Sequence, residues 1–106
     1  MKYVAKHGID DLERVKTVIE KAYGSYSQRL SDYNPNLQWE DDRHATVSFT
    51  VAKKTINTDF EITDEEIRIE GKIPLIFKVF ESKIEKVVGG EVDKWIAKAR
   101  AGELDE

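Results

Sequence analysis

The first third of the chain carries apolar and aromatic residues at steps of three and four positions. They are Leu12, Val15, Ile19, Ala22, Tyr23, Tyr26, Leu30 and Tyr33. At about 100° per residue they fall on one stripe, which is typical of an amphipathic helix with a single buried face. Asp10 and Glu13 resemble a capping box at its start, and Asn34-Pro35 ends it. The pattern predicts a helix over about residues 10–32, after a short strand at residues 3–5.

Four segments follow in which apolar and polar residues alternate. They cover residues 37–39, 45–51, 56–62 and 67–69, with polar residues between them. A period of two predicts strands with one buried and one solvated face, and connections this short make the strands antiparallel. Lys53-Lys54 is the expected turn between the second and third segments, although no Gly or Asn fixes its type.

A second helix is predicted from Pro74, because proline suits the first turn of a helix. The expected buried stripe is Ile73, Ile76, Phe77, Phe80, Ile84, Val87 and Val88. Beyond Gly89-Gly90 the apolar residues Val92, Trp95 and Ile96 are rotated by about 90° on the same wheel. We therefore expect a bend or break of the helix at the two glycines.

These elements predict an α+β fold with two layers, in which two amphipathic helices cover an antiparallel sheet in the order β-α-β-β-β-β-α. The order resembles the TATA-binding-protein-like, or minimal helix-grip, arrangement. We expect a single domain over residues 1–106 with a frayed tail from about residue 101. The expected core includes Trp39, Phe49, Phe60, Ile69 and Phe80.

The composition of the chain excludes several classes of function. The chain has 106 residues, of which 40% are hydrophobic and 36% charged, and a net charge of -4. Phosphate contacts require clustered Lys and Arg, so we expect no nucleic-acid binding. The absence of cysteine excludes disulfides and thiolate ligands. The longest apolar run, residues 73–77, is too short to span a bilayer, and no signal-peptide core is present, so the expectation is a cytoplasmic protein.

Residues of catalytic type do not form a recognisable motif. Asp41-Asp42-Arg43-His44 has metal-ligand chemistry but the composition of an ordinary turn. Acidic residues between 59 and 70 alternate with apolar ones, which predicts solvated cross-strand charges. The histidines lack a nucleophile context. We therefore predict no catalytic residue, no metal site and no cofactor.

Leu75 and Val79 are the sharpest anomaly of the pattern. They neighbour each other at a spacing of four, yet they point away from the predicted buried stripe. A helix that is apolar nearly all round is buried on more than one side. Either this chain covers the two residues, or they contact an external apolar surface with Lys78 and Lys83 beside them.

The aromatic residues suggest an alternative site. Tyr23, Tyr26, Trp39, Phe49 and Phe60 are expected in the layer between helix and sheet. They are candidates to line a pocket for a small apolar ligand. Aromatic residues are also ordinary core material, and a chain of this length has little room for an empty cavity. Packing in the core is therefore the favoured interpretation.

The chain resembles the polyhydroxyalkanoic acid system protein family of bacteria. The resemblance is carried by Leu37-Gln38-Trp39-Glu40-Asp41-Asp42, by residues 60–70 and by Ile73-Pro74-Leu75-Ile76. It implies association with storage-polyester granules and transfers no catalytic residue. The leading hypothesis is a small non-enzymatic module that acts by apolar surface contact, with a granule, a lipid surface, a protein partner or a second copy as its target. A pocket-type binder and an enzyme of unrecognised type are the alternatives.

Overall fold

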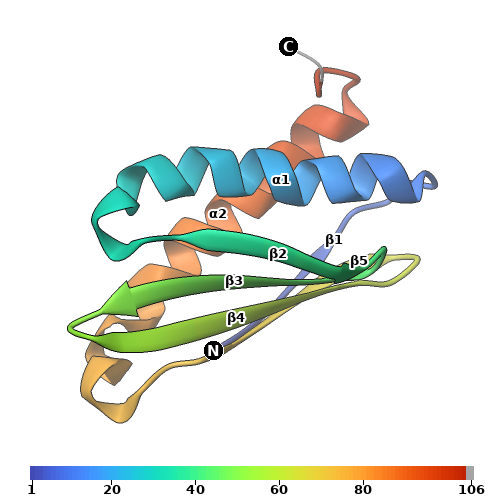
Figure 1. Ribbon diagram of the computed structural model, residues 1–106. Coiled ribbons are helices and arrows are strands. Elements are labelled where there is room, and N and C mark those ends of the chain that lie inside the picture. Colours follow the sequence, from blue (N-terminus) through green and yellow to red (C-terminus); the bar gives the residue numbers. More distant parts are fainter. Residues whose placement is uncertain (105–106) are drawn as a thin grey trace.

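One antiparallel sheet of five strands is covered on one face by two helices in the computed structural model, which describes residues 1–104 (Figure 1). The elements are β1 (Lys2–Lys6), α1 (Leu12–Arg29), the 3-10 helix η1 (Ser31–Tyr33), β2 (Asn36–Asp41), β3 (His44–Val51), β4 (Lys54–Ile62), β5 (Glu66–Lys72), the 3-10 helix η2 (Leu75–Phe80) and α2 (Glu81–Arg100). The α+β class and the order β-α-β-β-β-β-α are confirmed.

The strands lie in the order β1-β5-β4-β3-β2. Strands β2 to β5 form a meander, and β1 pairs antiparallel with β5 at the far edge. The connection from β1 to β2 is therefore α1, which runs across the apolar face of the sheet (Figure 1). Helix α2 packs against α1 and over β1, so the two helices share that face.

The register places the large side chains of neighbouring strands together. Phe49 is opposite Ile56, and Phe60 is opposite Ile69. Phe49, Phe60 and Ile69 are at most 6% exposed, as the alternating pattern predicts. Trp39 is partly buried and packs against this core. Phe80 is 54% exposed, so its assignment to the core is wrong.

The first helix closely follows its pattern. The predicted capping residue, Asp10, is wrong by one position: the N-cap is Asp11, whose side chain accepts a hydrogen bond from the backbone of Glu13 at 3.0 Å. A side-chain acceptor at this position satisfies one of the free N–H groups of the first turn. The helix ends at Arg29 and continues as η1, and Asn34 then takes a left-handed conformation with φ of 48°. The predicted end at residue 32 thus falls within η1.

The expected break at Gly89-Gly90 is wrong, because α2 runs without interruption from Glu81 to Arg100. Val88, Val92, Ile96 and Ala99 form one buried stripe along it. The rotation inferred from the sequence arose because residues 73–80, which precede α2, were placed on the same α-helical wheel. The change in helix geometry lies at Phe80, nine residues before Gly89.

Gly89 has a different role, because it lets α2 approach β1. A Cβ atom there would lie 2.8 Å from Cζ of Tyr3. The Tyr3 hydroxyl donates a hydrogen bond to Asp93, which with burial raises the pKa of Tyr3 to about 12. Gly90 faces open space. Of the two glycines, only Gly89 is required by packing.

The C-terminal end of α2 is closed by a turn. The N–H of Glu103 donates to the carbonyl of Lys98 at 2.8 Å, and Gly102 adopts a φ of 76°. This is the pattern of a Schellman motif. Leu104 is 2% exposed and belongs to the core. The frayed tail expected from residue 101 is therefore wrong as far as Leu104, and residues 105–106 lie outside the described residues.

The two glycines of α2 give a matched stability test. Gly90→Ala should raise the free energy of unfolding by about 0.5–1 kcal/mol, because alanine is the better helix former and the site is open. Gly89→Ala gains the same propensity but forces a methyl group onto the Tyr3 ring, and overpacking costs about 1–3 kcal/mol. Urea unfolding followed by circular dichroism would compare them. Equal stabilisation by both substitutions would contradict the close contact between α2 and β1.

Candidate functional site

The segment η2 exposes most of the large apolar side chains found on the surface. Of the six exposed large hydrophobic residues within residues 1–104, four lie in this segment of six residues. They are Leu75 at 84%, Ile76 at 62%, Val79 at 80% and Phe80 at 54% exposed. Contiguous exposed apolar residues on a single chain usually mark an interaction site. These four residues are called the η2 patch below.

The patch follows from the geometry of a 3-10 helix. Three residues complete each turn, so residues three apart lie above one another. The pairs are Leu75 with Lys78, Ile76 with Val79, and Phe77 with Phe80. Phe77 and Phe80 line a cavity, and Ile76 shares the outward face of Val79. Placing Ile76 in the buried stripe was therefore wrong. Leu75 and Val79 are exposed, because no part of residues 1–104 covers them.

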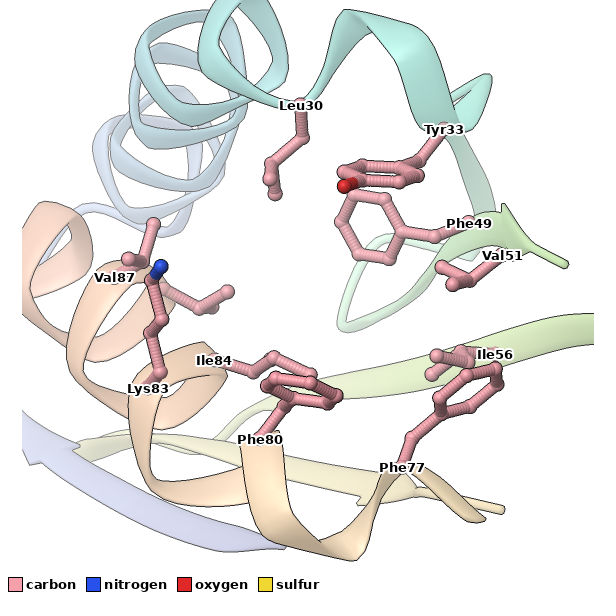
Figure 2. A pocket seen from close by; sticks show the side chains of 11 residues that line it. Leu30, Tyr33, Phe49, Val51, Ile56, Phe77, Phe80, Lys83, Ile84 and Val87 are labelled. Carbon is pink, nitrogen blue, oxygen red and sulfur yellow. The ribbon is translucent and has the colours of Figure 1, made fainter.

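Beside the η2 patch lies an apolar cavity of about 290 Å³. Its walls come from the end of α1, from η1, β3, β4 and η2, and from the first turns of α2, and Figure 2 shows these side chains around the central space. The lining residues are Leu30, Tyr33, Phe49, Val51, Ile56, Phe77, Phe80, Lys83, Ile84, Val87 and Val88. Phe49, Ile56 and Val88 are buried and form its floor, while Tyr33, Phe80 and Lys83 are exposed at its rim.

Of the five aromatic residues that the sequence suggested as pocket lining, Phe49 alone lines this cavity. Tyr26 and Phe60 are buried in the core, and Tyr23 and Trp39 are partly buried against it. The Tyr26 ring is tilted against Phe49 with centroids 6.3 Å apart, and burial raises the pKa of its phenol. The cavity was missed because its walls meet only in three dimensions.

Two lysines lie beside the apolar surface, Lys78 within η2 and Lys83 in the cavity lining. Lys78 forms an ion pair with Glu81 at 3.4 Å. Lys83 has no ion-pair partner within residues 1–104. Lys53 and Lys54 lie at the tip of the β3–β4 hairpin, next to the cavity residues Val51 and Ile56.

The tip of this hairpin is conformationally strained. Ala52 has a φ of 50° and Lys53 a φ of 67°. Left-handed backbone is unfavourable for residues with a Cβ atom, and hairpin turns of this kind favour Asn-Gly. The sequence analysis placed this turn at Lys53-Lys54, whereas its two central residues are Ala52 and Lys53. The prediction was off by one residue because no Gly or Asn marks the central positions.

The other polar clusters have structural explanations. Glu61 is opposite Arg68 on the solvated face of the sheet and pairs with it at 3.5 Å. His7 is buried, with Nδ1 accepting from the backbone of Ile9 at 3.0 Å and Nε2 2.9 Å from the carbonyl of Thr63. Ser25 accepts a hydrogen bond from Nε1 of Trp95. These groups stabilise the fold.

His44 lies between two carboxylates at the β2–β3 hairpin. Nδ1 is 2.8 Å from Asp41 and Nε2 is 3.3 Å from Glu61. The hydrogen bond with Asp41, and then that with Glu61, raises the pKa of His44. Asp41 also accepts from the backbone of Arg43 at 2.8 Å, which closes the predicted turn.

Relieving the strained hairpin should stabilise the protein. Replacing Ala52 by Asn and Lys53 by Gly matches the residues to their positive φ angles. We expect the free energy of unfolding to rise by about 1–2 kcal/mol, because a left-handed conformation costs roughly that much per ordinary residue. Chemical denaturation would measure the change. A less stable double variant would show that the wild-type side chains make compensating contacts.

The ion pairs of His44 predict a pH dependence. Because its folded pKa is raised above the unfolded value, its contribution to stability is complete below the unfolded pKa and is lost as the pH rises through the folded pKa. Asp41→Asn should lower the pKa of His44, measured by NMR titration of the imidazole protons. Stability differences between variant and wild type should shrink as His44 deprotonates. An unchanged titration would contradict the contact with Asp41.

Comparison with known proteins agrees with the resemblance read from the sequence. The sequence model of one family, described as putative polyhydroxyalkanoic acid system protein, matches residues 5–96. The matched region extends from β1 into α2 and contains the η2 patch and the whole lining of the cavity. No curated protein and no solved structure gives a significant match. In the described part of the chain, no helix has the length and apolarity needed to cross a membrane. The chain belongs to the polyhydroxyalkanoic acid system protein family.

Proposed function

We propose that this protein is a non-enzymatic module that docks on the apolar surface of polyhydroxyalkanoate storage granules through the η2 patch. The observation that carries the proposal is the exposure of Leu75, Ile76, Val79 and Phe80 on one short segment. The family gives the chemical context, because its description names the storage polyester. An uncharged polyester offers the kind of surface on which such side chains are buried from water.

The energetic scale suits reversible adsorption. Burial of one large aliphatic side chain contributes about 1.5–3 kcal/mol. The four side chains of the patch together contribute about 6–12 kcal/mol, which offsets an entropic cost of association of similar size. The interaction is then strong enough to hold a protein on a granule that offers many equivalent positions.

The lysines beside the patch suit a protein that lies at an interface between polymer and water. Lys78 and Lys83 carry long apolar stems with a charged end. Such side chains cover apolar surface while the ammonium group stays in water. Their ammonium groups would stay in water and so limit how deeply η2 enters the polymer surface.

The cavity supports a binding role more than a catalytic one. Among its eleven lining residues, only Tyr33 and Lys83 carry polar side-chain groups. General acid–base or nucleophilic chemistry requires polar groups that converge on one reacting atom. The lining instead offers an apolar environment with two polar groups at the rim.

Charge substitutions in the patch test the proposal. Leu75→Glu with Val79→Glu should reduce co-sedimentation with polyester granules by more than about 100-fold in affinity, since two buried side chains are lost. Circular dichroism should be unchanged, because both side chains are exposed.

Val4→Glu with Thr50→Glu is a matched control. Both residues are exposed on strands β1 and β3, and the substitutions add the same charge. The control should still sediment with granules. Equal loss in both double variants would mean that net charge and not the patch determines binding. Retained binding by the Leu75/Val79 variant would exclude η2 as the contact. If the Leu75/Val79 variant loses self-association in sedimentation velocity but still binds granules, the patch contacts a second copy of the chain instead.

A further inference from the structure

We infer that the cavity beside η2 binds one free aliphatic acid of medium chain length, with its hydrocarbon chain inside and its carboxylate at Lys83. This inference goes beyond the granule contact, because it concerns the concave space lined by Phe77 and Phe80 and not the outward side chains of Leu75 and Val79.

The size of the cavity limits the ligand. An apolar cavity of about 150 Å³ accommodates one benzene molecule. A volume of about 290 Å³ is therefore enough for a ligand of about a dozen non-hydrogen atoms. A carboxylic acid with eight to ten carbons has roughly that number. Its chain would meet the buried floor formed by Phe49, Ile56 and Val88.

The polar groups at the rim determine the head group. Figure 2 shows the amine of Lys83 at one side of the cavity, and the hydroxyl of Tyr33 pointing inward from the other side. Nearby Lys78 is paired with Glu81, whereas Lys83 has no ion-pair partner among the described residues. The ammonium of Lys83 complements a singly charged carboxylate, and hydrogen bonds between charged groups are the stronger ones.

The distribution of exposure also fits an amphipathic ligand. The floor residue Val88 is 1% exposed and Ile56 3%, while Tyr33 at the rim is 41% exposed. Ligand sites commonly combine an apolar interior with a few placed polar groups that fix the orientation. A chain that enters methyl end first would leave its carboxylate at the wet rim.

A series of acids of increasing chain length tests whether the hydrocarbon chain lies inside the cavity. Isothermal titration of the full chain with the acids from hexanoate to tetradecanoate should give a Kd on the order of 0.1 mM for decanoate. Affinity should increase about fourfold per added methylene, then level off near ten carbons when the cavity is full. No binding of decanoate at millimolar concentration would overturn the inference. An affinity that rises without levelling off would show adsorption to the open surface and would also overturn it.

Two lysine variants and an alcohol test whether the carboxylate of the ligand binds Lys83. Lys83→Met keeps the apolar stem and should weaken decanoate binding by about tenfold or more. Lys86→Met removes a charge from the same helix, at a residue that does not line the cavity, and should leave the Kd within about twofold. Decanol should bind more weakly than decanoate to the wild type and equally to Lys83→Met. Equal weakening by both lysine variants, or decanol binding as tightly as decanoate, would overturn the assignment of Lys83.

The same assay separates this inference from the proposed function. The variant with Leu75→Glu and Val79→Glu should retain decanoate binding, because neither side chain lines the cavity. Retained granule binding with no binding of the acid would overturn the inference alone. Retained acid binding by a wild type that does not adsorb to granules would overturn the proposed function alone.

Discussion

The structure depends on covering the one apolar face of the five-stranded sheet. Helices α1 and α2 pack against each other over that face, and Gly89 lets α2 approach β1 until it touches the ring of Tyr3. Near Phe49 and Ile56, α1 ends and α2 begins, so η1 and η2 have to complete the cover. Both are short 3-10 helices, which present few side chains inward. The cover is incomplete there, and both the cavity and the η2 patch result from it.

Much of this fold could be predicted from the sequence because its signals are local. Alternation over residues 45–51 and 56–62 fixes which side chains enter the core, and a register error of one residue would have exposed Phe60. The stripe of α1 is likewise a property of one segment. Such patterns need no knowledge of how distant elements meet.

The parts that failed depend on geometry or on distance between elements. Ile76 was placed in the core because a 3.6-residue period was applied to η2, whose period is three. Phe80 does face the cavity, but nothing in its own segment shows that the cavity is open beside it. The packing role of Gly89 was missed because nothing in the sequence of α2 shows that a Cβ atom at this position would lie 2.8 Å from Tyr3. The exposure of Leu75 and Val79 was one of two open alternatives. The cavity brings together Leu30, Val51 and Val87, which no periodicity relates.

The η2 patch and the cavity are two parts of one apolar region that meet at Phe80. We have proposed two apolar targets for this region, namely the surface of a storage polyester and a free aliphatic acid. The outward patch suits the first and the concave cavity the second. Their physical basis is the same, namely apolar side chains that the short 3-10 segments leave uncovered.

The most direct measurement of the central claim uses the absence of cysteine in this chain. Val79→Cys and Val4→Cys each create a single labelling site, one in η2 and one on the exposed side of β1. With a polarity-sensitive dye attached, adding polyester granules should shift the emission to the blue at position 79 and leave position 4 unchanged. A shift at position 4 or at neither position would contradict the assignment of η2 as the contact surface.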